Sequence, residues 1–116
     1  MSQNISNLKK QFLNYLEIEK GRSLNTVKNY DRYLSRFFKF SEIKSPSEIS
    51  QDKIREFRLW LNRQENKKQG AEKSTLKKQT QNYYLIALRS FLKYLAKNDI
   101  KTLAPEKIEL AKTKMR

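Results

Sequence analysis

Apolar residues recur every three or four positions in four separate stretches of this 116-residue chain. That spacing is typical of one face of an α-helix, which turns once in about 3.6 residues. Two stretches cover about 5–20 and 24–41, a third runs from about 51 to a polar run at 65, and the fourth covers about 75–97. Because the chain has only 2 Gly and 2 Pro, it lacks the turn residues of an all-β domain. The pattern therefore predicts a small all-α domain.

The ends of these predicted helices carry recognisable signals. Gly21 follows the first stretch and suits the left-handed backbone that commonly ends a helix. Ser23 is a candidate N-cap of the second helix, and Ser50 is a candidate N-cap of the third, with Ile49 and Ile54 placed to form a hydrophobic staple. The predicted core faces are Ile5, Leu8, Phe12, Tyr15 and Leu16; Val27, Tyr30, Leu34, Phe37 and Phe38; Ile54, Phe57 and Leu61; and Tyr84, Leu85, Leu88, Phe91, Leu92 and Leu95.

Three breaks separate or follow the predicted helices. The first lies at 45–47 around Pro46, and the second is the polar run 65–72, which indicates a loop. Ser74 or Thr75 is expected to cap the fourth helix. After it, Pro105 suits the first turn of a short helix, and residues 112–116 have the composition of a tail or an outgoing linker.

Missing residue types exclude several function classes. The chain has no Cys and no His, so a zinc site, a disulfide, a thiolate nucleophile and a histidine general base are all excluded. No run of 18 apolar residues is present, and the N-terminus does not read as a secretory signal. We expect no cofactor, no metal, no catalytic residue in this chain and no membrane contact, and a cytoplasmic, nucleoid-associated location.

Positive charge is concentrated in two of the four helices. The chain has 26 Lys+Arg against 12 Asp+Glu, a net charge of +14, which favours an anionic partner. Residues 20–39 hold six bases and one acid, and residues 66–101 hold nine bases and two acids. Residues 1–19 and 40–65 are each neutral. The second and fourth helices therefore carry nearly all of the charge, as a phosphate-binding side would require.

The polar faces of these two helices mix the side chains that bind phosphates with those that read bases. Lys and Arg neutralise phosphates, whereas Asn, Gln and Arg have donors and acceptors that match base edges. An ordinary solvated helix surface has a similar composition, so the pattern alone leaves both readings open. Tyr30, Tyr83, Tyr84 and Tyr94 either stack on bases or pack in the core. Trp60 and Leu59 contact a partner or are covered by the 65–72 loop, and an exposed Ile86 could touch a thymine methyl.

Two stretches resemble the core-binding domain of tyrosine recombinases, which include phage integrases and Xer-type recombinases. Residues 12–30, with the turn Gly21-Arg22-Ser23-Leu24-Asn25-Thr26, resemble its first helix and Gly-x-Ser-x-x-Thr turn. Residues 80–95 are similar to its fourth helix, and 48–57 to its third. Tyr83 stands where the family usually has Arg, and Ile86 where it usually has Ser. The resemblance covers about residues 5–112.

The resemblance implies a SAM-like four-helix orthogonal bundle, with a short C-terminal helix possible by the Pro105 signal. It implies that residues 1–101 form a DNA-binding domain and 102–116 a linker toward a catalytic domain that this chain lacks. The implied partners are double-stranded DNA and the other protomers of a recombinase tetramer, while the isolated domain is expected to be monomeric. The candidate DNA-binding residues are Arg22, Ser23, Asn25, Thr26, Lys28, Asn29, Arg32, Arg36, Lys77, Lys78, Gln79, Asn82, Tyr83, Arg89 and Lys93.

Two other hypotheses remain at this point. One is a stand-alone helical DNA-binding regulator, and the other is a basic module that binds an acidic protein. A regulator would end near Arg116, whereas a recombinase fragment would continue into a domain with Arg, His and Tyr. The acidic-partner module would show no preference for duplex DNA over another polyanion.

Overall fold

The computed structural model describes residues 4–68 and 74–110, with the side chains of all of these except 64–68 and 74–78. Four α-helices make up most of this part of the chain: α1 (Ile5–Ile18), α2 (Leu24–Ser41), α3 (Gln51–Lys68) and α4 (Ser74–Lys97). Two 3₁₀ turns follow α2 and α4, η1 (Pro46–Glu48) and η3 (Pro105–Lys107). The described residues include no strand, so the all-α prediction is confirmed.

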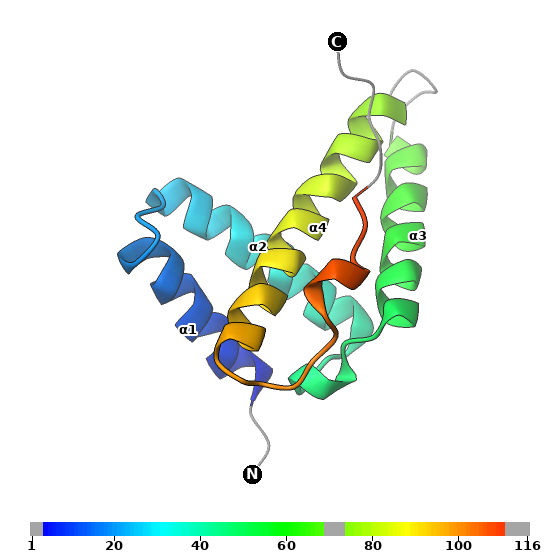
Figure 1. Ribbon diagram of the computed structural model, residues 1–116. Helices are drawn as coiled ribbons and strands as arrows, with labels where there is room; N and C mark the ends of the chain where they lie inside the picture. Colours follow the sequence, from blue (N-terminus) through cyan, green and yellow to red (C-terminus); the bar gives the residue numbers. More distant parts are fainter. Residues whose placement is uncertain (1–3, 69–73, 111–116) are drawn as a thin grey trace.

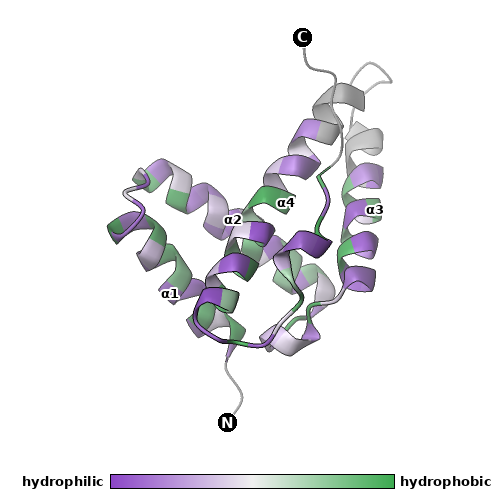
Figure 2. Cartoon of the chain, viewed as in Figure 1, coloured by the Kyte–Doolittle hydropathy of each residue, from purple (hydrophilic) through white to green (hydrophobic). Residues whose placement is uncertain are grey.

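Helix α4 is central to the bundle because α1, α2 and α3 all pack against it (Figure 1). All four helices carry both hydrophobic and hydrophilic residues, as Figure 2 shows. The predicted core faces are confirmed: all but Tyr15, Val27 and Tyr30 are buried, and these three pack partly buried against the core. Phe12 of α1 joins α1 to α4, with its ring centroid 5.4 Å from that of Phe91 and 5.5 Å from that of Tyr94.

The local signals read from the sequence form as predicted at three positions. The Ser23 hydroxyl accepts a hydrogen bond from the Thr26 backbone N–H (3.2 Å), which caps α2. The Ser50 hydroxyl accepts one from the Lys53 N–H (3.2 Å) at the start of α3. Gly21 has φ +65°, in the left-handed region that a side chain disfavours. The Gly21 turn and the Ser23 cap fix how the chain passes from α1 into α2.

The end of α3 differs from the prediction. The run 65–72 was expected to be a loop, but α3 continues through Lys68. Glu, Lys and Gln in this run are good helix formers, so a polar stretch can extend an existing helix. Helix α4 begins at Ser74, close to its predicted start, while the predicted capping by Ser74 or Thr75 lies outside the described side chains.

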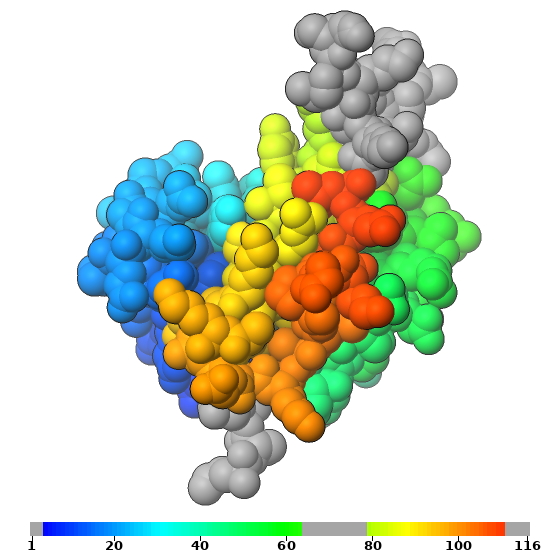
Figure 3. Space-filling view, in the orientation of Figure 1, coloured from blue at the N-terminus to red at the C-terminus, as the bar shows by residue number. Residues whose placement is uncertain are grey.

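Residues 102–110, here called the C-terminal strap, lie against α3 and α4 (Figure 3). Ile108 is buried in the core, and the predicted short helix at Pro105 is η3. Arg58 of α3 donates to the Glu109 carbonyl (3.0 Å) and Arg89 of α4 donates to the Ile108 carbonyl (3.3 Å). The strap is thus packed onto the bundle, while the assignment of 102–116 as a linker stays a prediction.

Candidate nucleic-acid interface

The exposed face of α2 presents cations that neighbouring side chains hold in place. Arg32 donates to the Asn29 side-chain oxygen (3.2 Å), and its guanidinium lies 5.3 Å from the centre of the Tyr33 ring. Tyr33 in turn contacts Tyr84 of α4, with ring centroids 4.6 Å apart. The periodicity of α2 places Asn29 and Arg32 toward its outer side because Leu34 and Phe37 occupy the inner side, while Tyr33 packs partly buried against the core. Arg32 is therefore exposed but not randomly oriented.

Arg36 joins three helices at this surface. Its guanidinium donates to the Tyr84 hydroxyl of α4 (2.8 Å) and lies 5.3 Å from the centre of the Trp60 ring of α3. Trp60 also stacks on Phe40 of α2, at 4.9 Å between centroids. A guanidinium has five N–H donors, so the bond to Tyr84 orients Arg36 and leaves donors for a ligand. Trp60 is thus partly covered by α2, while the predicted cover by residues 65–72 lies outside the described side chains.

The neighbouring part of α4 contributes uncharged side chains. Tyr83 is 53 % exposed and follows Gln79 by one helical turn, so both lie on the same exposed face. Ile86 lies on this face too and is 38 % exposed. We call Asn29, Arg32, Arg36, Gln79 and Tyr83 together the α2–α4 surface. Lys77 and Lys78 precede it on α4, but their side chains lie outside the described part.

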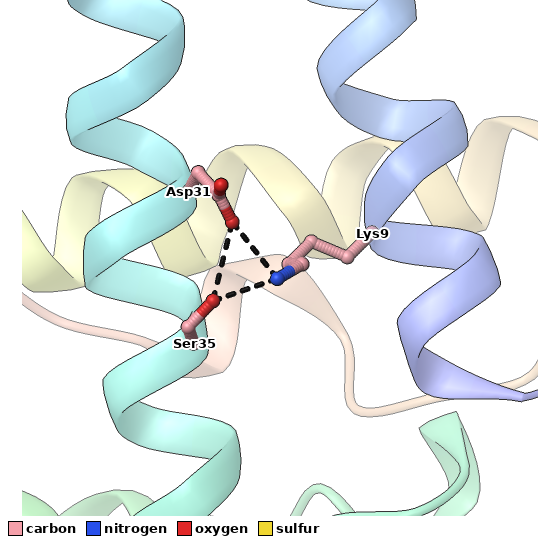
Figure 4. A network of polar contacts seen from close by, with 3 residues as sticks. All are labelled: Lys9, Asp31 and Ser35. Carbon is pink, nitrogen blue, oxygen red and sulfur yellow. Dashed lines mark hydrogen bonds and ion pairs between the residues drawn. The ribbon is translucent and has the colours of Figure 1, made fainter.

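A contact from α1 engages Asp31, the one acidic residue of the segment 20–39. Asp31 forms an ion pair with Lys9 of α1 (2.8 Å), and Lys9 also donates to the Ser35 hydroxyl (2.7 Å), as Figure 4 shows. The Ser35 hydroxyl donates to Asp31 (3.2 Å). Since the Asp31 carboxylate is occupied by Lys9, it does not neutralise the arginines on the outer side of α2. The pair also ties α1 to α2.

The remaining predicted residues of α2 lie at its first turns. Asn25 and Lys28 are exposed, and Arg22 is exposed just before the helix. Ser23 and Thr26 are occupied in the cap, where the Ser23 hydroxyl also lies 3.2 Å from the Thr26 hydroxyl. Their structural role accounts for both residue types without a ligand.

Two predicted residues of α4 lie apart from the α2–α4 surface. Arg89 is held by the strap through its bond to Ile108. Lys93 is exposed about 15 Å along α4 from Tyr83, at a helical rise of 1.5 Å per residue. Asn82, next to Tyr83, is half-buried and is engaged in an interaction. Among the predicted cations with described side chains, the structure thus separates a group on and just before α2 from a group on the C-terminal half of α4.

The four tyrosines considered for stacking on bases differ in how far they are exposed. Tyr84 is buried, and Tyr30 and Tyr94 pack partly buried against the core. Burial raises the pKa of the Tyr94 hydroxyl, with smaller contributions from Glu19 and Tyr15. Only Tyr83 of the four is largely exposed.

Sequence reasoning missed the residues that position the surface. Tyr33, Tyr84 and Trp60 contact the α2 arginines. The sequence predicted Tyr84 to be core or base-stacking and Trp60 to contact a partner or lie under a loop, and it assigned no role to Tyr33. Lys20 and Lys97 were also outside the candidate set, although the charge count included them. Nothing in the sequence around Tyr84 indicates that Arg36 lies beside it, since the contact joins residues 48 positions apart.

The family model for the phage integrase N-terminal SAM-like domain matches residues 10–99. The chain belongs to this family. Its stretch of 102 matched residues is 33 % identical to the protein named tyrosine recombinase XerC in two strains of Leptospira interrogans, of serovars Copenhageni and Lai. That match covers 85 % of this chain and 30 % of each relative, so the chain spans about a third of their length. No solved structure gives a significant match.

The family match confirms the SAM-like character of the bundle, in agreement with the resemblance read from residues 12–30 and 80–95. Within the described ranges, no cluster of three Asp or Glu side chains is placed to hold a metal ion. None of the described helices is both long and apolar enough to cross a membrane.

Proposed function

We propose that this chain is a duplex-DNA-binding domain of a tyrosine recombinase, with the α2–α4 surface against the DNA. The observation that carries this proposal is the set of contacts from Asn29 through Arg32 and Tyr33 to Tyr84 and Arg36. These contacts hold two guanidiniums at the junction of three helices. A cation that is already oriented loses less conformational entropy when it binds a phosphate.

The chemistry of this surface suits both parts of a duplex. Arg32 and Arg36 can neutralise phosphates or donate to guanine, and Asn29 and Gln79 have the paired donor and acceptor that match adenine. Tyr83 adds a hydroxyl and an exposed ring where the family usually has Arg. The predicted Lys28, Asn25 and Arg22 extend the cationic face toward the start of α2.

We propose that strand cleavage and rejoining belong to a catalytic domain outside the residues described here. This chain contains no histidine, and the relatives named tyrosine recombinases are about three times as long as the match. In the whole protein, the partners would be DNA and the other protomers of the recombinase, in the cytoplasm with the nucleoid. The 116-residue chain alone is expected to be monomeric and to cleave no DNA.

Fluorescence anisotropy with a labelled duplex of mixed sequence tests the binding function. If Lys28, Arg32 and Arg36 of α2 each contact one phosphate, the logarithm of the association constant should fall against the logarithm of salt concentration with a slope of about −2.7 or steeper. A single strand of the same length should bind more weakly, since the surface offers one exposed ring for stacking. An affinity for duplex that does not change with salt would contradict the proposal. Equal displacement of the duplex by polyglutamate would instead support an acidic protein partner.

A further inference from the structure

A second cluster of positive charge lies between the α1–α2 turn and the C-terminal half of α4, in a groove of about 290 Å³. Four cations line it: Lys20 and Arg22 from the α1–α2 turn, and Lys93 and Lys97 from the C-terminal half of α4. We call it the basic groove. In Figure 3 it lies between the blue α1–α2 turn and the yellow-to-orange end of α4. Two segments about 70 residues apart in the sequence thus bring four cations together.

The turn that carries Lys20 and Arg22 is fixed by its backbone. The Lys20 N–H donates to the Tyr15 carbonyl (3.1 Å), and the Arg22 N–H donates to the Leu16 carbonyl (3.0 Å). Gly21, between them, supplies the positive φ that this turn needs. The two cations therefore enter the groove from a defined backbone and not from a tail.

The charge of the groove is uncompensated by its own walls. Among the described residues that line it, none is acidic; the others are Phe12, Tyr15, Leu16, Tyr30, Ser90 and Tyr94. Glu19 lines the adjoining hollow beside Lys97, and Glu106 and Glu109 line another beside Lys93. A cleft walled by one sign of charge focuses the electrostatic potential and concentrates anions.

The aromatic residues of the groove favour a phosphate over a base. Their rings are occupied by one another, with 4.9 Å between the centroids of Tyr15 and Tyr94 and 6.4 Å between those of Phe12 and Tyr30. The Lys97 ammonium lies 5.4 Å from the centre of the Tyr15 ring. The groove therefore offers ammonium and guanidinium groups beside rings that already contact one another, and little open ring surface for a nucleobase.

We propose that the basic groove is a second phosphate-binding site, which takes the backbone of duplex DNA beyond the segment held at the α2–α4 surface. This inference rests on the proposed DNA-binding function. Arg22 precedes α2, and Arg36 lies about 18 Å along the helix from its first residue, Leu24, so one phosphate cannot contact both arginines. The groove contributes affinity and orientation without reading sequence, because phosphate contacts carry no base information.

The test compares two double variants of the 116-residue chain that remove the same charge. The groove variant, Lys20→Ala with Lys97→Ala, removes two of the four cationic side chains that line the groove. The control variant, Lys10→Ala with Lys101→Ala, removes two exposed lysines that do not line it. Lys20→Arg with Lys97→Arg keeps the charge and is the rescue variant. Anisotropy is measured with a duplex of roughly one helical turn and one of roughly three turns, about 10 and 30 base pairs.

On the long duplex, the groove variant should bind at least about tenfold more weakly than the control, with a salt slope smaller by about 1.8, which is two phosphate contacts. The rescue variant should bind like the unsubstituted chain. On the short duplex the groove and control variants should agree within about twofold, because one turn is filled by the α2–α4 surface. Melting curves of each variant confirm that it is folded.

Equal affinities of the groove and control variants on the long duplex would overturn the second site while leaving the α2–α4 surface intact. A groove variant that binds DNA normally but loses polyglutamate binding would also overturn it, and would assign the groove to an acidic protein. If the unsubstituted chain binds no duplex at all, both the second site and the proposed function are wrong.

Discussion

Arginines at two regions of this molecule look alike in the sequence and differ in the structure. At the α2–α4 surface, Arg32 and Arg36 are held by side chains and remain exposed. At the C-terminal strap, Arg58 and Arg89 donate to the backbone carbonyls of Glu109 and Ile108. All four arginines contribute equally to the net charge of the chain. The difference teaches that net charge does not show where an exposed, oriented guanidinium lies: two of these four arginines face outward from α2, and two are anchored to the strap.

The strap should matter for stability and not for DNA affinity. Ile108 is buried at 3 % exposure, and replacing a buried Ile by Ala costs about 2–5 kcal/mol of unfolding free energy. We therefore expect Ile108→Ala to lower the urea midpoint strongly, while the folded variant binds duplex normally. Leu24→Ala is the control, since Leu24 is 61 % exposed. Equal midpoints for the two variants would show that the strap does not pack as described.

Substitutions at the α2–α4 surface, unlike those at the strap, should weaken DNA binding. Arg32→Glu with Arg36→Glu removes two oriented cations and adds repulsion, so duplex affinity should fall by about a hundredfold at roughly 0.1 M salt. The matched control is Lys10→Glu with Arg55→Glu, which changes the net charge equally at exposed positions of α1 and α3. Anisotropy titrations compare the two. A control that weakens binding as much would mean that total charge, and not this surface, governs affinity.

Removing the strap arginines sharpens the comparison further. Arg58→Ala with Arg89→Ala should cost about 1–3 kcal/mol of stability, because each guanidinium hydrogen bond is worth about 0.5–1.5 kcal/mol. Amide hydrogen exchange should speed up at residues 102–110. Duplex affinity should change by less than about twofold, as for substitutions away from a contact. A loss of affinity close to that of the α2 variant would place Arg89 on the DNA.

The smallest expected effect concerns Tyr94, beside the basic groove. Its pKa is raised by burial first and by Glu19 and Tyr15 second, so the folded state favours the neutral phenol. This contribution to stability is complete below the unfolded-state pKa of about 10 and is lost as the pH rises through the higher folded-state pKa. Tyr94→Phe should therefore lose less stability than the unsubstituted chain between about pH 9 and pH 11 in thermal melts. Parallel curves would contradict the assignment.

The sequence predicts those parts of the fold that depend on near neighbours. The cap at Ser23, the cap at Ser50 and the positive φ at Gly21 each involve residues within a few positions, so their signals are local. The predicted end of α3 was wrong because its last residues are polar helix formers. Such a run has no apolar stripe to show that the helix continues. Burial of Phe12 and Phe91 followed from periodicity alone.

The site was predicted less completely because its decisive contacts are long-range. The α2 arginines appear in the sequence as a charged face, but their support by Tyr84 and Trp60 depends on how α2 crosses α4 and α3. The bond from Arg89 to Ile108 requires the strap to fold back onto α4. The basic groove likewise needs the α1–α2 turn to meet the end of α4, which periodicity within single helices cannot indicate.

The most direct test of the α2–α4 surface is a ¹H–¹⁵N NMR titration of the chain with a duplex of roughly one turn, about 10 base pairs. We predict that the largest amide shifts fall at residues 29–36 of α2 and 79–84 of α4, with small shifts at 51–58 of α3 and at the strap. Shifts concentrated at 102–110 and the first turns of α3, with α2 unaffected, would contradict the account.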